Sequence, residues 1–477
     1  MPSDHGASSA ADWARSGVVA LTGHAGGPPL VPPGDAAGFA GRVTARLAAA
    51  TQDTQHPVRV DGAALLGERA AIGGRSRRGP VAVGGACRLL PTADGWAAVS
   101  CARPDDPSLL GALVGAALPD DVWPAVAAWL RTRPGAELAE RAALLGLPAA
   151  PVRRPTGPVV LPVPGRPRPV AGLLVVDFSA LWAGPLCAHL LGLAGARVVK
   201  VETPQRLDGA RRGNPDFYRL LHAGHRSVLL DPETSAGRRA MAALVDAADI
   251  VIEASRPRAL TGFGLDAEAA VERGTIWVSI TANGRGSPRV GFGDDVAAGA
   301  GLVALDATHR PVFCGDAVAD PLTGLVAAEL ALSAPENGRG RLFDVAMSAV
   351  VAATLTTRQA APNQATTNQA APNQATANQA TANQATANQA TTNQAGTDEC
   401  AAPAARPDGA GWVVDTPDGP VPVAAPRHRE VTGRAPQPGQ HTTDVLHALR
   451  KSPRQDPTRS TTPRETHRHT TEAPHTP

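Results

Sequence analysis

The sequence predicts an α/β fold centred on a Rossmann-like, open parallel sheet with helices on both faces. The first observation is a series of short, continuous apolar runs of strand length, such as LLVVDF at 173–178 and DIVIEAS at 249–255. The second is that segments with helical apolar spacing, such as 184–195 and 234–248, alternate with these runs. Strands that are apolar along their whole length and separated by helices are typical of parallel sheets buried on both faces.

The alternation runs through residues 172–357, which we expect to form one α/β core. The predicted strands are 173–178, 196–202, 226–231, 249–255, 275–281, 311–316 and 341–347, and the predicted helices are 184–195, 234–248, 294–305 and 321–333. Because helical segments separate most consecutive strands, we expect the strands to pair in parallel.

Residues 1–150 predict a smaller α+β region. The segment 94–102 has the character of a strand, and 122–132 and 136–146 have the apolar spacing of amphipathic helices. Residues 151–171 are so rich in proline that we expect an extended linker there.

The C-terminal part begins with a five-residue repeat, NQAxx, within residues 358–400. Apart from the amides, its largest side chains are those of Ala and Thr, which cannot fill a core, so we expect disorder. In the short segment 401–450 the stretch 411–423 predicts a hairpin that turns at its PDG sequence. The Thr-, Pro-, Arg- and His-rich tail, 451–477, is expected to be disordered as well.

Composition limits the classes of partner. The formal net charge of +2 excludes binding driven by an overall charge excess, so we expect no nucleic-acid partner. The 5 cysteines are odd in number and scattered, which predicts neither a disulfide framework nor a metal site. The sequence has no signal-peptide pattern at its start and no apolar run of about 18 residues, so we expect a cytoplasmic protein without a membrane partner.

The common nucleotide and hydrolase motifs are absent from the α/β region. No GxGxxG, GxxxxGK[ST] or GxSxG occurs. Ligands of open parallel sheets bind beyond the carboxyl ends of the strands, so the polar residues at the predicted strand ends are the candidates. These are Asp177, Ser179, Glu253, Ser255, Arg256, Thr281, Asn283 and Asp316.

Asp316 is the most informative of these residues. It ends a predicted strand beside Gly315, which would leave room for a ligand. The structural alternative is that Asp316 caps the next helix, but Asp320 followed by Pro321 already supplies such a cap. We therefore weigh a functional role of Asp316 equally with a structural one. A carboxylate near a helix N-terminus could act as a nucleophile or a general base.

Other polar residues have simpler interpretations. Asp294 and Asp295 open a predicted helix, and capping is the favoured reading. Cys314 lies inside a predicted strand, where a buried thiol is expected. Five arginines near strand ends could together hold a polyphosphate, although surface solvation explains most arginines; they are Arg206, Arg211, Arg212, Arg256 and Arg258.

Several motifs in order resemble one known family. They are DFSALWAGPLCAHLLGLAGARVVKVE, HRSVLLD, ADIVIEASRPRAL, GFGDDVAAGAGLV and FCGDAVADPLTG, all within about residues 168–350. Together they resemble the class III CoA-transferases, the CaiB/BaiF family. The stretch 88–115, with the helices after it, is similar to segments that lie downstream in the family chain, so residues 1–150 resemble later family segments.

The resemblance implies roles for particular residues. The family's catalytic aspartate corresponds to Asp316. The CoA contacts implied by the motifs are Leu181, Trp182, Ala183, Leu230, Ser255, Arg256 and Ala259. Backbone groups and arginine donors at strand ends suit a nucleotide and its phosphates.

The implied activity is transfer of CoA from an acyl-CoA thioester to a carboxylic acid acceptor. It would proceed through an aspartyl anhydride and an aspartyl-CoA thioester on Asp316. CoA and acyl-CoA would be substrates, no cofactor would be bound permanently, and the family implies a homodimer.

Two alternatives stay open. One is an acyl-CoA racemase or isomerase; the racemase branch of the family has a histidine where this chain has Asp294, which argues against it. The other is a catalytically silent CoA-binding or scaffold protein that uses the repeats for contacts.

Overall fold

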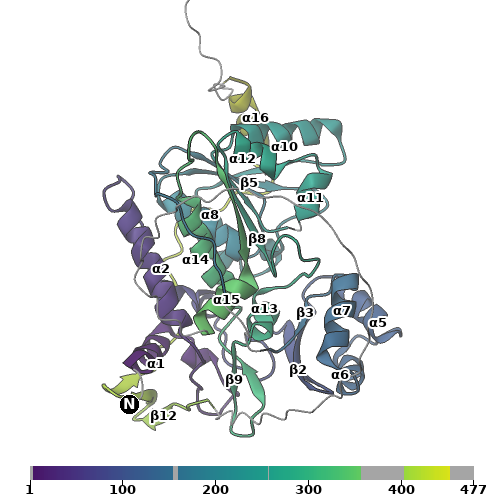
Figure 1. The fold of residues 1–477 in the computed structure, drawn as a ribbon, viewed down its shortest axis with the longest axis vertical. Coiled ribbons are helices and arrows are strands. Elements are labelled where there is room, and N and C mark those ends of the chain that lie inside the picture. Colours follow the sequence, from purple (N-terminus) through teal and green to yellow (C-terminus); the bar gives the residue numbers. More distant parts are fainter. Residues whose placement is uncertain (1–3, 154–158, 256, 356–401, 452–477) are drawn as a thin grey trace, which may run out of the picture.

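The centre of the molecule is a six-stranded, fully parallel sheet with the strand order β11-β8-β7-β4-β5-β6 (Figure 1). This computed structural model describes residues 4–153, 159–255, 257–355 and 402–451. The strands of the sheet are β4 (Leu174–Asp177), β5 (Arg197–Glu202), β6 (Arg226–Leu229), β7 (Ile250–Glu253), β8 (Ile276–Thr281) and β11 (Arg341–Ala346). The predicted α/β class with a parallel sheet is confirmed.

Both faces of the sheet are apolar because successive side chains of each strand point to opposite sides. Val175 of β4 packs into the core on one face and Val176 into the core on the other. The first face carries α8 (Ala183–Leu193), α9 (Pro215–His222) and α14 (Ala319–Ala331); the second carries α10 (Ser235–Ala247), α11 (Pro257–Gly262) and α12 (Ala267–Glu272). This arrangement explains why the strands are apolar at every position.

One predicted strand of the sheet belongs elsewhere. The apolar run before Asp316 forms β10 (Pro311–Phe313), which pairs antiparallel with β9 (Val303–Leu305) in a separate hairpin. The preceding helix, α13 (Gly293–Gly299), is correspondingly shorter than predicted. The run is apolar because Val312 lies in the main core while Phe313 packs into a smaller cluster against β1 and β2. A hairpin strand that is buried on both sides, such as β10, therefore has the same apolar sequence pattern as a strand of a buried parallel sheet.

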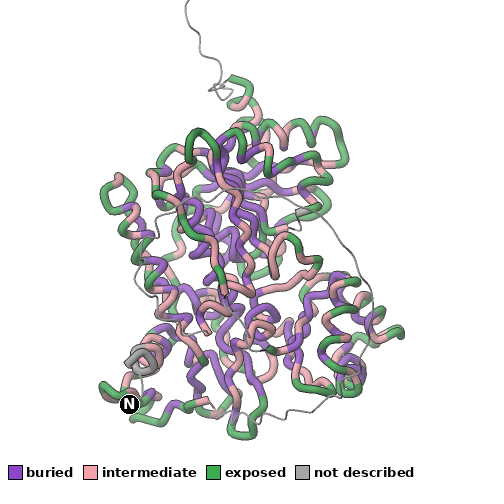
Figure 2. The backbone as a smooth tube through the Cα atoms, viewed as in Figure 1, coloured by how far each residue is buried: buried purple, intermediate pink, exposed green. Residues whose placement is uncertain are grey.

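The first part of the chain contributes to the main core through helices that the sequence analysis does not predict. They are α1 (Asp4–Ser16), η1 (Val19–Leu21), α2 (Ala36–Thr51), α3 (Gly62–Leu65) and α4 (Glu68–Ile72). Trp13 and Leu47 share one hydrophobic cluster with Leu322 of α14. The predicted strand and two helices follow in a satellite unit with its own core: β1 (Cys87–Thr92), β2 (Gly95–Ser100), α5 (Asp106–Val114), α6 (Trp123–Arg131), α7 (Gly135–Leu145) and β3 (Ala149–Pro151). Figure 2 shows buried residues running from the sheet into the first region.

The last described segment returns to both ends of the molecule. It forms β12 (Arg406–Asp408), β13 (Gly411–Thr416), β14 (Gly419–Pro422) and, beside α10, α16 (Thr442–Lys451). The predicted hairpin is present, since β13 and β14 pair antiparallel. The helix α15 (Met347–Leu355) ends just before the repeats, and the predictions for the repeats and the tail fall on residues outside the described ranges.

Over the described part of the chain, no helix combines the length and the apolar character that crossing a membrane requires.

Candidate active site around Asp316

Asp316 lies in a short loop between β10 and α14. The residues on either side of it have left-handed backbones, Gly315 with φ +67° and Ala317 with φ +51°. A Cβ at Gly315 would come within 2.7 Å of the Val318 side chain. The expectation that this glycine leaves room for a ligand is therefore wrong, because its space is already filled and its backbone conformation is what requires glycine.

The Asp316 carboxylate is fully buried and is held by two arginines from the first part of the chain. Arg69 of α4 donates from Nε to Oδ2 at 2.9 Å and from Nη2 to Oδ1 at 2.5 Å. Arg75 Nη1 lies 3.5 Å from Oδ2. The Arg69 pair is bidentate, the geometry in which a guanidinium binds a carboxylate most strongly.

Two further carboxylates share the field of Arg69. Burial raises the pKa of Asp294 to about 6 and the pKa of Asp320 to about 7, partly offset by the nearby Arg69 charge. Asp294 Oδ1 accepts a hydrogen bond from the Ala317 amide at 2.8 Å. The carboxylates are thus fixed around the Asp316 loop, and the two raised pKa values lie within the physiological range.

The helix caps predicted at α13 and α14 differ from those in the structure. Asp295, not Asp294, caps α13, since its Oδ1 accepts from the Phe292 amide at 2.9 Å. Asp320 is the second residue of α14, and Val318 stands at the N-cap without a side-chain cap. The argument that Asp320 relieves Asp316 of a capping role is therefore wrong, because the helix begins before the Asp-Pro pair.

The loop after β4 approaches the same place. Trp182 is buried, its ring centroid lies 5.2 Å from the Arg69 guanidinium carbon, and it makes an edge contact with Phe217 at 5.3 Å. Leu181, with φ +71°, has its amide held by Asp208 at 3.0 Å. Of the predicted CoA contacts, Trp182 is thus the one linked through Arg69 to Asp316.

A buried network of charged side chains contacts the loop after β4. Lys200 Nζ donates to the Ser179 carbonyl at 2.8 Å and lies 2.9 Å from Asp208 Oδ2. The Lys200 charge holds the pKa of Asp208 far below its usual value despite burial, and His222 lies 3.6 Å away on the same carboxylate. Lys200 and Asp208 thus connect the loop after β4 to the neighbouring part of the chain through the Ser179 carbonyl and the Leu181 amide.

The other predicted CoA contacts are spread along the carboxyl edge of the sheet. Ser255 follows β7, the direct neighbour of β4, and Ala259 lies in α11. Leu230 directly follows β6, and β5 lies between β6 and β4 in the sheet. Its side chain packs into the core on the opposite face from Trp182. Arg256 lies outside the described residues.

The sequence model of CoA-transferase family III matches residues 170–418, a little over half of the chain. The chain belongs to CoA-transferase family III. The resemblance noted from the motifs is confirmed by this match.

Two CoA-transferases are similar to part of this chain. The succinate–glutarate CoA-transferase of Agrobacterium fabrum is 31% identical over 220 residues, which cover 41% of this chain and 55% of that protein. The succinyl-CoA–D-citramalate CoA-transferase of Chloroflexus aurantiacus is 30% identical over 197 residues, covering 38% and 49%. This chain therefore spans about half the length of the curated relatives it matches.

Solved structures give a similar coverage. The crystal structure of Rv3272 from Mycobacterium tuberculosis is 31% identical, with a TM-score of 0.36, over 39% of this chain and 56% of that one. A CaiB/BaiF family protein from Brucella suis is 30% identical, with a TM-score of 0.36, over 40% and 56%.

The residues that touch Asp316 in this family III chain were missed by the sequence analysis. Arg69 and Arg75 lie outside the matched residues and, in the case of Arg69, 247 positions away from Asp316. Their segment, RAAIGGRSRRGPVAVGG, is basic and rich in glycine, which could have marked it as a ligand-binding stretch. No local pattern, however, indicates which carboxylate such arginines meet.

The simpler interpretations of the remaining residues fit the structure. Burial raises the pKa of the Cys314 thiol well above its usual value, which makes a thiolate nucleophile unfavourable. Arg211 forms a two-pronged pair with Glu202 and stacks over Tyr218, so it is not a free phosphate ligand. Arg211 is therefore not available for the polyphosphate site that the five arginines could have formed.

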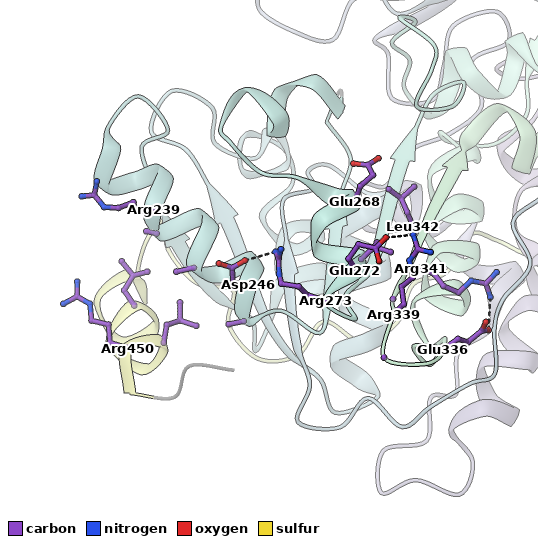
Figure 3. Close-up of a pocket in the computed structure, with 18 of the residues that line it drawn as sticks. Arg239, Asp246, Glu268, Glu272, Arg273, Glu336, Arg339, Arg341, Leu342 and Arg450 are labelled. Atoms are coloured by element: carbon purple, nitrogen blue, oxygen red, sulfur yellow. Dashed lines mark hydrogen bonds and ion pairs between the residues drawn. The ribbon is translucent and has the colours of Figure 1, made fainter. Parts of the chain in front are cut away.

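A cavity of about 1950 Å³ lies on another part of the molecule. It is bounded by α10, α12, α16 and the start of β11, and Figure 3 shows its charged side chains. Six of these charged side chains form three ion pairs with one another: Arg273 with Asp246, Arg339 with Glu272, and Arg341 with Glu336. The family III motif residues Trp182 and Asp316 do not line it.

Proposed function

We propose that this protein is a CoA-transferase that moves CoA from an acyl-CoA thioester to a carboxylic acid, with Asp316 as the nucleophile. The observation that carries the proposal is the fully buried Asp316 carboxylate, fixed between β10 and α14 in a family III chain. Burial matters because an acyl anhydride survives only where water is excluded.

The bonds change in two matched halves. An oxygen of Asp316 attacks the thioester carbon of the donor, the C–S bond breaks, and CoA leaves as its thiolate. The thiolate then attacks the Asp316 carbonyl carbon, which releases the donor acid and leaves an aspartyl-CoA thioester. The acceptor carboxylate reverses both steps and restores the Asp316 carboxylate.

We further propose that CoA lies along the carboxyl edge of the sheet, on Leu181, Trp182, Ala183, Leu230, Ser255, Arg256 and Ala259. Two buried polar atoms there, Trp182 Nε1 and Ser255 Oγ, have no hydrogen-bond partner within the described ranges. Buried donors without partners are costly, so a ligand that satisfies them would gain from it. This supports a ligand that reaches both the β4 loop and the end of β7.

The names of the relatives suggest which acids to test first. Succinate and glutarate appear in the name of one relative, and succinyl-CoA with citramalate in another. We propose short carboxylic acids as the first acceptors and succinyl-CoA as the first donor. The family resemblance implies a homodimer, which analytical ultracentrifugation tests, and the sequence patterns predict a cytoplasmic location.

A covalent trap tests the nucleophile. The purified protein is incubated with a panel of acyl-CoA donors, hydroxylamine is added, and the peptide that contains Asp316 is examined by mass spectrometry. We expect a hydroxamate at Asp316 that is absent from Asp316→Asn and Asp316→Ala. Asp306→Asn serves as the matched control, because Asp306 lies at the turn of the β9–β10 hairpin that precedes Asp316 and accepts a hydrogen bond from the Thr308 amide. Donor binding without any modification of Asp316 would contradict the proposal and favour a silent CoA-binding protein.

One observation favours a second candidate, an acyl-CoA racemase. The racemase branch has a histidine at this position, and its replacement by Asp294 argues against the activity. In its favour, burial raises the pKa of Asp294 to about 6, which would let this carboxyl group exchange protons near neutral pH. Loss of the α-deuterium from a chiral acyl-CoA, catalysed without any acceptor acid, would identify this activity.

A further inference from the structure

The two arginines that hold Asp316 are partly exposed, whereas the carboxylate itself is not. Both oxygens of the buried carboxylate are bound in the Arg69 fork, while the side chains of Arg69 and Arg75 are 25% and 34% exposed. A solute that reaches this place therefore contacts the partly exposed arginine side chains before the fully buried carboxylate. Anions are the solutes that such a pair attracts.

Acylation of Asp316 would change the charge at this point. As an anhydride or a thioester, Asp316 is neutral, and Arg69 loses the partner of its bidentate pair. The remaining carboxylates in its field are Asp294 and Asp320, with pKa values of about 6 and about 7. At neutral pH Asp294 is mostly ionised and Asp320 about half ionised, so together they offset the charges of Arg69 and Arg75 only in part. A largely buried guanidinium group without a full counter-charge is costly, so the intermediate favours an incoming anion.

The surroundings keep the Arg69 fork in place for that exchange. The Trp182 ring lies against its guanidinium group at 5.2 Å. The adjacent Glu68 is fixed by Arg429, which donates from Nε at 2.8 Å and from Nη2 at 2.7 Å. A Cβ at Gly84 would lie 3.3 Å from Arg69, 3.5 Å from Arg75 and 3.6 Å from Asp316, so the absence of a side chain leaves space among all three charged groups.

We propose that Arg69 and Arg75 bind the carboxylate of the acid substrate, and that Arg69 exchanges the Asp316 carboxylate for it in each turnover. This inference rests on the proposed function and adds a role for residues outside the family match. When CoA thiolate attacks the anhydride, the C–O bond to the donor acid breaks and that acid leaves as a carboxylate, which the freed fork binds. The acceptor carboxylate takes the same place before it attacks the aspartyl thioester. The exchange consumes no proton and no redox equivalent.

The test separates the two halves of the reaction. The donor half is measured as hydroxamate formation at Asp316 from the productive acyl-CoA. The acid half is measured as entry of the isotopically labelled free acid of that donor into its own CoA thioester, for which the acid is an acceptor by microscopic reversibility. With succinyl-CoA as donor, for example, the labelled acid is succinate.

We expect Arg69→Lys to raise the KM for the free acid by about 10- to 100-fold, because lysine keeps the charge but not the two-pronged geometry. The KM for the acyl-CoA should change by less than about 3-fold, and Asp316 should still be labelled. Arg75→Lys, which leaves the bidentate pair intact, should raise the KM for the acid by about 3- to 10-fold. It provides a second measurement if Arg69→Lys does not fold.

Arg46→Lys is the matched control. Arg46 of α2 makes a bidentate pair with Glu329 of α14, at 2.5 and 2.9 Å, away from Asp316. Its KM for the free acid should equal that of the unaltered protein.

Two outcomes would overturn the inference and one would overturn the proposed function. If Arg69→Lys and Arg75→Lys both leave the KM for the acid unchanged while Asp316 is still labelled, the inference is wrong and the transferase proposal stands. Loss of labelling in folded Arg69→Lys would also overturn the inference, by placing Arg69 in activation of Asp316. No labelling of the unaltered protein would overturn the proposed function itself.

Discussion

At the scale of single residues, the carboxylates near α13 show how burial separates groups that are neighbours in the sequence. Asp294 and Asp295 are adjacent, but Asp294 turns to the Ala317 amide whereas Asp295 accepts from Ser100 Oγ at 2.7 Å and from the Phe292 amide. Asp295 therefore links α13 to β2. Burial raises its pKa to about 7, and the hydrogen bonds from Ser100 and Phe292 only partly oppose that.

This shift predicts a pH-dependent stability. The unfolded chain loses the Asp295 proton near the ordinary value of 3.8, whereas the folded protein keeps it up to about 7. The free energy of unfolding should therefore fall as the pH rises between about 4 and 7. The asparagine of Asp295→Asn does not titrate, so this variant should not show the same loss. Its free energy of unfolding relative to that of the unaltered protein should therefore rise by on the order of 2 kcal/mol between pH 5 and pH 8.

Urea unfolding at the two pH values measures the difference. Asp120→Asn is the control, because Asp120 is exposed and its charge is solvated in both states. Parallel pH curves for Asp295→Asn and the unaltered protein would show that the buried carboxyl does not hold its proton.

At the scale of elements, the pair α8 and α14 brings the Trp182 loop and the Asp316 loop together. Both helices lie on the same face of the sheet and follow these loops directly (Figure 1). Gly324 of α14 allows the contact, since a Cβ there would lie 2.6 Å from the Ala183 carbonyl oxygen and 3.1 Å from the Leu186 side chain. The spacing of the two loops therefore depends on the absence of a side chain at Gly324.

Two glycine-to-alanine changes with opposite signs follow from this contact. Gly324→Ala should lower the free energy of unfolding by about 1–3 kcal/mol, because the backbone of α8 must move away. Gly41→Ala, in the middle of α2 with nothing within 4 Å of the added Cβ, should raise it by about 0.5–1 kcal/mol through helix propensity. Chemical denaturation of both variants checks the pair. A stabilising Gly324→Ala would mean that the helices are not in close contact.

At the scale of the whole molecule, three distant stretches meet around Asp316. The core supplies Asp316, the first region supplies Arg69, and the segment after the repeats supplies Arg429, which holds the buried Glu68 next to Arg69. The same segment also pairs with the first region at Val31 and lies beside β6. The last described segment thus contributes to the position of the arginine that holds Asp316.

A neighbouring pair of arginines tests this anchoring. Arg429→Ala should lower the free energy of unfolding by about 3 kcal/mol, because Glu68, with a side chain 1% exposed, would keep a buried charge without its partner. Arg427→Ala should cost less than about 1 kcal/mol, because Arg427 and Asp61 are 47% and 54% exposed and water replaces the pair. Guanidinium titrations of both variants measure the contrast. Equal losses would contradict the proposed anchoring by Arg429.

Local patterns in the sequence were enough to indicate the sheet, the satellite helices and the terminal hairpin. A run such as that of β4 is apolar on both faces wherever it is placed, and the PDG turn of the last hairpin depends only on neighbouring residues. The motifs between β4 and α14 were likewise enough to indicate the family. These features depend on interactions over a few residues.

Tertiary structure decided the partners. The apolar run of β10 indicates that the strand is buried, but it does not indicate which strand it pairs with. Its place in a hairpin with β9, outside the main sheet, could therefore not be predicted from its sequence. The helices α1 and α2 join the main core because distant side chains complete it. The Arg69 pair with Asp316 spans 247 positions, and such a contact forms only when both segments are already packed. Patterns of burial are local, whereas the choice of partner for a buried charge is set by the assembled fold.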